Sequence, residues 1–191
     1  MQTLKDQRIL VIGGSSGIGL AVARSAAEMG GAVTIASRSR DKLAAAVAEL
    51  GEGVAAQGLD TRDSAAVAAW FDGEAPWDHV LVSASDAATG QVRKLDLADA
   101  RAAMDSKFWG AYHVARAAKI NETGSLTLVS GYRSNRPSPA SVLQGAINAA
   151  IDGLTRGLAL ELSPIRVNSV SPGTIVTPMW NRLPEDQRQE M

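Results

Sequence analysis

The chain has 191 residues, enough to bury a hydrophobic core, and a net charge of −1. This balance argues against a nucleic-acid or membrane partner, and the lack of cysteine excludes disulfides, cysteine–metal sites and thiol catalysis. The first residues carry no apolar signal segment, and no apolar run approaches the roughly 20 residues that cross a bilayer. We therefore expect a cytoplasmic protein.

Short apolar strands alternate with helices along the chain. Strands are predicted at residues 8–12, 32–36, 54–59, 79–82, 125–129 and 165–170. Helices are predicted at residues 18–29, 41–50, 63–71, 97–120 and 142–162. This order predicts an α/β fold with a doubly wound parallel sheet, a Rossmann-type three-layer sandwich. We expect one domain over residues 1–191 that is short at its C-terminal end.

A glycine-rich turn separates the first strand from the first helix. Glycine lets the backbone turn sharply and lets a pyrophosphate approach, and the following helix offers N–H groups to an anion. A glycine-rich turn without a ligand is the alternative, but the position after the first strand favours a nucleotide. The predicted cofactor-binding residues here are Gly13, Ser15, Ser16, Gly17, Ile18 and Gly19.

The second and third strands each end in a candidate cofactor contact. No acidic residue ends the second strand, where one would hold the ribose 2′-hydroxyl of NAD. Arg38 could instead pair with a 2′-phosphate, assisted by Ser37, which favours NADP(H) over NAD(H). Arg38 as a solvated residue at a helix start is the alternative. Asp60 could accept a hydrogen bond from an adenine amino group or simply begin a turn.

The sixth strand ends in Pro172-Gly173, which turns the chain over the expected cleft. Thr177 and the backbone of Ile175 could face a nicotinamide there. An ordinary Pro-Gly turn is the alternative. These four residues complete the predicted cofactor site.

These motifs together resemble the short-chain dehydrogenase/reductase family over residues 8–177. The glycine turn, the Asp60 loop and the Arg166–Gly173 run follow the family's order and spacing. The resemblance implies NAD(P)(H) binding and hydride transfer between nicotinamide and an alcohol or carbonyl. It places Gly13, Ser15, Ile18, Arg38, Asp60 and Thr177 at cofactor-binding positions. Ile12 stands where the family has threonine.

The family's catalytic set is replaced in this chain. The positions of its Tyr and of the Lys four residues later fall on Gln144 and Asn148, and amides have no accessible pKa for proton transfer. The family's Asn position is Lys107, and its Ser position is Ser130 or Gly131.

Two hypotheses follow. In the first, Tyr132, Lys107 and Ser130 form a non-standard catalytic set, in which the Lys107 ammonium lowers the pKa of the Tyr132 phenol. Arg133 would then help to bind the polar end of a small-molecule substrate, although Tyr132 packing the loop and Lys107 bonding carbonyls is the alternative. In the second hypothesis, the protein is an inactive NADP(H)-binding sensor or scaffold.

Two further expectations concern metals and subunits. Two isolated histidines do not make a metal site, so no metal is expected. The helices at residues 97–120 and 142–162 are rich in Ala and Leu and could bury a face against a second subunit. We therefore expect a homodimer or homotetramer.

Overall fold

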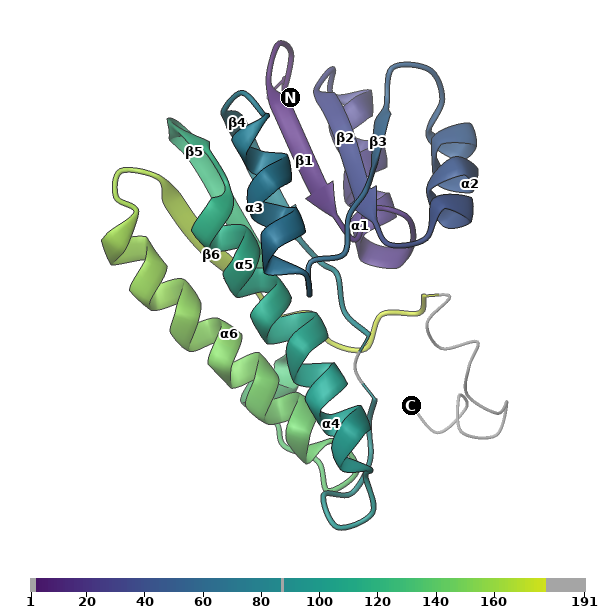
Figure 1. Cartoon of the computed structure of the whole chain (residues 1–191), viewed down its shortest axis with the longest axis vertical. Coiled ribbons are helices and arrows are strands. Elements are labelled where there is room, and N and C mark those ends of the chain that lie inside the picture. The colour runs from purple at the N-terminus through teal and green to yellow at the C-terminus, as the bar shows by residue number, and fades with distance from the viewer. Residues whose placement is uncertain (1–2, 87, 178–191) are drawn as a thin grey trace.

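The computed structural model describes residues 3–86 and 88–177. Its sheet has the strand order β3-β2-β1-β4-β5-β6, and every neighbouring pair is parallel (Figure 1). The strands are β1 (Arg8–Ile12), β2 (Ala32–Ser37), β3 (Ala55–Gly58), β4 (Trp77–Val82), β5 (Ile120–Val129) and β6 (Arg166–Val170). The predicted doubly wound Rossmann-type fold is confirmed. The expected domain includes residues beyond 177, which lie outside the described residues.

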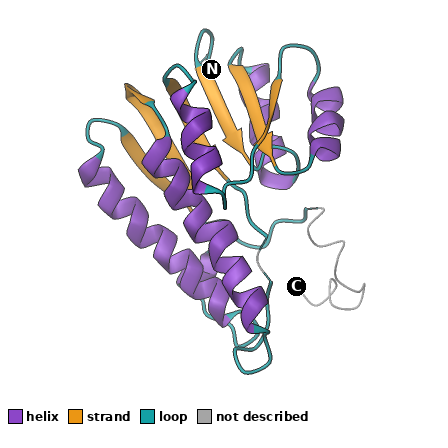
Figure 2. Ribbon diagram, in the orientation of Figure 1, coloured by secondary structure: helices purple, strands orange, loops and turns teal. Residues whose placement is uncertain are grey.

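Helices cover both faces of the sheet because the strands are apolar on both sides (Figure 2). Ile9 and Val11 of β1 pack with α1 and α2, whereas Leu10 and Ile12 pack with α3, α5 and α6. Alternate residues of one strand therefore serve two core layers. The helices are α1 (Gly17–Glu28), α2 (Arg40–Leu50), α3 (Ser64–Asp72), α4 (Leu97–Met104), α5 (Gly110–Ala117) and α6 (Val142–Glu161).

The prediction of one continuous helix over residues 97–120 is wrong in the middle of that range and at its end. A π-helical segment, Asp105–Trp109, separates α4 from α5, and α5 ends at Ala117. The wider turn of a π-helix shifts the helical phase, so that Ser106 and Lys107 are both buried. The chain then becomes extended, and β5 begins at Ile120 rather than at residue 125 because Ile120 pairs with buried Trp77.

Candidate functional site

The candidate site lies beyond the carboxyl ends of the strands, where the sheet changes winding direction. β1 pairs with β2 on one side and with β4 on the other, so the loops after β1 and β4 lead to helices on opposite faces. In open α/β sheets this switch point forms the ligand crevice.

The glycine turn after β1 needs its glycines for geometric reasons. Gly13 has φ +85°, and a Cβ built on it would lie 2.6 Å from the backbone N of Ala84 in the loop after β4. Gly17 has φ +55°, a left-handed conformation that disfavours other residues. A Cβ on Gly19 would clash with the carbonyl oxygen of Gly13. The turn is thus a compact backbone surface that side chains would fill.

The predicted cofactor residues from different segments lie close to this turn. Ser15 Oγ donates a hydrogen bond to Ser37 Oγ at the end of β2, at 2.9 Å. A Cβ on Gly17 would lie 3.3 Å from Thr177 Cβ, so the segment after β6 reaches the turn as well. At the N-terminus of α1, Ser16 makes no side-chain capping bond within the described residues, and the first turn holds no acidic side chain. This surface fits the pyrophosphate of a dinucleotide.

Two ion pairs lie in the loops that follow β2, β3 and β4. Arg38 Nη2 lies 2.9 Å from Asp86 Oδ2, and Arg62 donates to both carboxylate oxygens of Asp60. The hydrogen bond from the Arg62 side chain, above all, holds the pKa of Asp60 below its ordinary value. Neither Arg62 nor Asp86 was predicted as a site residue from the sequence. Both pairs join residues of loops, where charged residues are common and where pairing leaves no periodic signal in the sequence.

A buried ammonium lies at the centre of the candidate catalytic region. Lys107 Nζ donates to the backbone O of Ser130 at 2.7 Å and to Asn148 Oδ1 at 2.6 Å. Only 9% of Lys107 is exposed, and burial lowers its pKa to about 8. Ser130 Oγ donates to the backbone O of Asn148 at 3.1 Å. The structure therefore brings Lys107, Ser130 and Asn148 together.

Asn148 is the partner that the sequence analysis did not assign. The sequence analysis predicts that Lys107 stands at the family's Asn position and Asn148 at its Lys position, which would make the pair a reciprocal exchange of residue types. That reciprocal exchange was the available signal. Gly131 accommodates it, because a Cβ at this position would lie 2.7 Å from Asn148 Nδ2.

Tyr132 lies in the 3₁₀ turn Tyr132–Ser134, which follows β5. Its backbone N–H donates to Pro172 O at 3.0 Å, which joins the loop after β5 to the segment after β6. The Arg133 guanidinium lies 4.6 Å from the centroid of the Tyr132 ring. The hydrogen bonds of Lys107 go to Ser130 and Asn148 rather than to this phenol.

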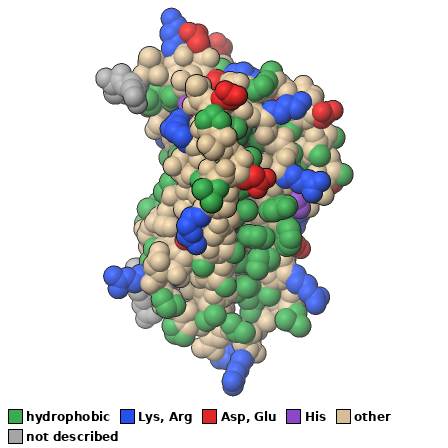
Figure 3. Space-filling view, turned by 90° about the vertical axis from the view of Figure 1, so that its left-hand side faces the viewer, with side chains coloured by type: hydrophobic (Ala, Val, Ile, Leu, Met, Phe, Trp, Pro, Cys, Tyr) green, Lys and Arg blue, Asp and Glu red, His purple; other side chains and the backbone are tan. Residues whose placement is uncertain are grey.

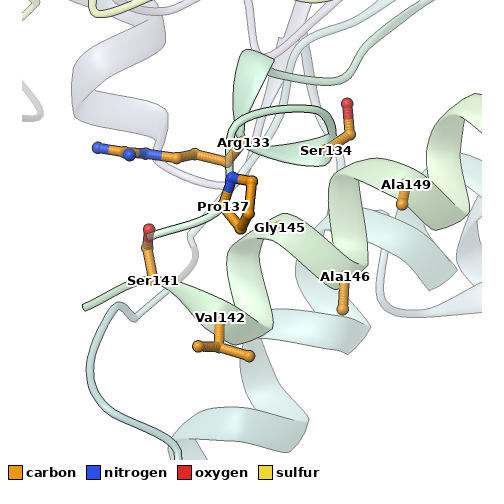
Figure 4. A pocket seen from close by; sticks show the side chains of 8 residues that line it. All are labelled: Arg133, Ser134, Pro137, Ser141, Val142, Gly145, Ala146 and Ala149. Carbon is orange, nitrogen blue, oxygen red and sulfur yellow. The ribbon is translucent and has the colours of Figure 1, made fainter. Parts of the chain in front are cut away.

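A cavity of about 230 Å³ adjoins the 3₁₀ turn and the first turns of α6 (Figure 4). Its polar side chains are Arg133, Ser134 and Ser141, and the α6 side is formed by Val142, Gly145, Ala146 and Ala149. Ser141 Oγ is buried and has no hydrogen-bond partner within residues 3–86 and 88–177. The cavity is small and mostly apolar, with one cationic group at its edge.

The histidines have structural partners. His79 Nδ1 lies 2.8 Å from Ser125 Oγ, and His113 Nδ1 lies 2.9 Å from Thr61 O. Within the described part of the chain, no three His, Asp or Glu residues group so as to hold a metal ion. Nor does any helix described there have the length and apolar character needed to cross a membrane.

Comparisons with known proteins agree with this geometry. A family model described as enoyl-(acyl carrier protein) reductase matches residues 13–191. Short-chain dehydrogenase/reductase ucsE from Acremonium sp is 32% identical, over 94% of this chain and 76% of the relative. The corresponding protein ATR9 from Stachybotrys chlorohalonatus is 34% identical, over 94% and 78%.

Solved structures of known proteins also have a fold similar to that of this chain. The MalC reductase/Diels-Alderase from Malbranchea aurantiaca superposes with a TM-score of 0.87 at 26% identity, over 99% of this chain and 81% of that chain. A short-chain dehydrogenase/reductase family protein has a TM-score of 0.87 at 30% identity, over 96% and 80%. The chain belongs to the short-chain dehydrogenase/reductase family of nicotinamide-dependent oxidoreductases.

Proposed function

We propose that this oxidoreductase uses NADP(H) and acts on the carbonyl or alcohol group of a small molecule through a non-standard catalytic set. The Lys107 ammonium, buried against Ser130 O and Asn148 Oδ1, carries this proposal. Its pKa of about 8 lets it hold or release a proton near neutral pH, as an acid–base group requires. A bound nicotinamide supplies or accepts the hydride.

The cofactor is assigned to the residues around the glycine turn. The backbone from Gly13 to Gly19 would hold the pyrophosphate, and Arg38 with Ser37 would hold a 2′-phosphate. Asp60 would contact the adenine, with Arg62 keeping its carboxylate charged. Pro172, Gly173, Ile175 and Thr177 would border the nicotinamide.

The proton chemistry is assigned to Lys107, Tyr132 and Ser130. The Lys107 ammonium would supply the proton that the substrate oxygen gains on reduction, or would hold that proton in place. Ser130 would position Lys107 through its backbone oxygen and its bond to Asn148. The Tyr132 hydroxyl remains the predicted donor to the substrate oxygen, and Arg133 would face a polar group of the substrate beside the 230 Å³ cavity.

NADPH oxidation tests this function. The protein is incubated with NADPH and a panel of ketones and aldehydes, and the absorbance of reduced nicotinamide is followed. We expect turnover by the wild type and a loss of about 10²- to 10⁴-fold in kcat for Lys107→Met. Tyr132→Phe should lose a comparable factor if the phenol donates the proton. Glu49→Gln, at an ion pair with Arg24 between α1 and α2, is the matched control and should keep wild-type turnover.

An inactive NADP(H)-binding sensor or scaffold is the second candidate. The amides Gln144 and Asn148 at the family's Tyr and Lys positions favour it. It predicts NADPH binding by the wild type with no reduction of any carbonyl in the panel. Absence of NADPH and NADH binding would contradict both candidates.

A homo-oligomer remains a proposal as well. Hydrophobic side chains gather on the face in Figure 3, which views the left-hand side of Figure 1, where α6 lies. Trp109, Tyr112, Val142 and Leu160 are exposed large hydrophobic residues of the π-helical segment, α5 and α6. If these side chains are buried between subunits, sedimentation of the protein should show a dimer or a tetramer. That residues 1–191 form one domain and that the protein is cytoplasmic are also predictions.

A further inference from the structure

The Arg38–Asp86 ion pair crosses the adenosine side of the crevice. Arg38 follows β2 and Asp86 follows β4, and these two strands flank β1 on opposite sides. Their charged atoms lie 2.9 Å apart, and both side chains are about two-fifths exposed. The guanidinium assigned to a 2′-phosphate therefore already faces a carboxylate of the same chain.

The Asp86 backbone is held in place by the π-helical segment. Its N–H donates to Ser106 Oγ at 2.8 Å, and only 7% of Ser106 is exposed. The phase shift of the π-helical segment directs Ser106 inward. This bond fixes the loop after β4 where the Asp86 carboxylate reaches Arg38.

The surrounding charges leave little net positive charge for an additional anion. Arg62 is paired with Asp60, and its pKa is raised by that hydrogen bond and further by the charges of Asp86 and Asp105. Arg38 in turn helps to lower the pKa of Asp60. Two arginines and three aspartates thus act on one another at this end of the crevice.

We infer that Asp86 is a specificity-determining residue that weakens selection of NADP(H) over NAD(H). Its carboxylate competes with a 2′-phosphate for Arg38 and repels that anion. A ribose 2′-hydroxyl is uncharged and can donate to a carboxylate, so NAD(H) is not penalised. This inference rests on the proposed binding of NADP(H).

Direct binding titrations test it without turnover. NADPH, NADH and adenosine 2′,5′-bisphosphate are titrated into wild type, Asp86→Asn and the control Glu49→Gln by calorimetry. We expect Asp86→Asn to bind both 2′-phosphorylated ligands about three- to tenfold more tightly, with NADH unchanged within about twofold, since exposed pairs contribute modestly. Glu49→Gln loses an exposed Arg–carboxylate pair elsewhere and should match the wild type.

A double variant tests whether Asp86 acts through Arg38. In an Arg38→Met background the gain from Asp86→Asn should fall by at least half on a logarithmic scale. The inference is overturned if Asp86→Asn binds NADPH no more tightly, or tightens NADH equally, while its thermal melt matches the wild type. Wild-type protein that binds neither nucleotide would instead overturn the proposed function, and the inference with it.

Discussion

Lys107 donates to Asn148 Oδ1 at 2.6 Å, joining the π-helical segment to α6 inside the candidate active site. The family resemblance predicts that each residue stands where the family carries the other residue type. The charged member of the pair belongs to the π-helical segment, and the amide belongs to α6. The proposed acid–base role of Lys107 would therefore be exerted from the π-helical segment and not from α6.

The first prediction concerns stability against pH. Burial lowers the pKa of Lys107 from its ordinary 10.5 to about 8. Between these values the unfolded chain binds more protons than the folded one, so the free energy of unfolding contributed by Lys107 rises with pH. The gain approaches about 3 kcal/mol across the window. Below about pH 8 both states are protonated, and the full burial cost remains.

Urea unfolding at several pH values measures this gain. The difference between wild type and Lys107→Met isolates Lys107, because the other titrating groups are shared. We expect the wild type to gain stability relative to Lys107→Met as pH rises above about 8. A constant difference would show that Lys107 titrates normally.

The second prediction concerns the direction of catalysis. Reduction of a carbonyl consumes a proton, so kcat/KM for reduction should fall as pH rises through about 8, where Lys107 loses its proton. Alcohol oxidation should rise through the same range. Steady-state rates in both directions test this, and the inflection should disappear in any residual activity of Lys107→Met. An unchanged inflection in that variant would assign the titration to another group.

The third prediction uses the exchanged pair. Asn148→Lys alone would bury a second ammonium beside Lys107 and should destabilise the fold by about 3–5 kcal/mol. Adding Lys107→Asn should recover most of that loss, because one charge and one amide face each other again. Urea unfolding of the single and double variants measures the coupling. Exposed Asn135→Lys should change stability by less than about 0.5 kcal/mol, and additivity of the two buried changes would refute the coupling.

The main features of the fold could be predicted from local patterns. The run from Ile9 to Ile12 is apolar on both faces, as a central parallel strand must be, and Gly13 and Gly17 marked the turn. The π-helical segment could not be predicted, because one additional residue in a turn is chosen by tertiary packing. One such packing constraint lies at Gly110, where a Cβ would approach Thr61 Oγ1 to 2.6 Å.

The candidate site, too, could be predicted from the sequence only in part. Local motifs identified the cofactor turn, whereas pairs distant in sequence, such as Arg38 with Asp86, leave no local signal. Lys107 was expected near Tyr132 because Tyr132 adjoins the family's Ser position and Lys107 stands at its inward-pointing Asn position. Its hydrogen bonds instead follow from the inward phase of the π-helical segment and from the acceptor offered by Asn148.

The fourth prediction concerns Gly131. Its backbone is extended, at φ 163°, but a Cβ would lie 2.7 Å from Asn148 Nδ2. Gly131→Ala should therefore cost about 1–3 kcal/mol by displacing the amide that accepts from Lys107. Gly173→Ala is the matched control, because nothing lies within 4 Å of its Cβ position. Thermal unfolding compares them, and equal melting temperatures would show that Asn148 moves aside freely.

The fifth prediction compares two buried hydroxyls. Ser141 Oγ has no hydrogen-bond partner within the described residues, whereas Ser130 Oγ donates to Asn148 O. Ser141→Ala removes an uncompensated polar group and should be neutral or stabilising by up to about 1 kcal/mol. Ser130→Ala removes the second donor to the buried Asn148 carbonyl, which keeps its bond within α6, and should cost about 0.5–1.5 kcal/mol. Urea unfolding of the two variants and the wild type measures these changes in the free energy of unfolding. A loss of stability for Ser141→Ala as large as that for Ser130→Ala would mean that Ser141 Oγ has a partner, such as a buried water beside the cavity.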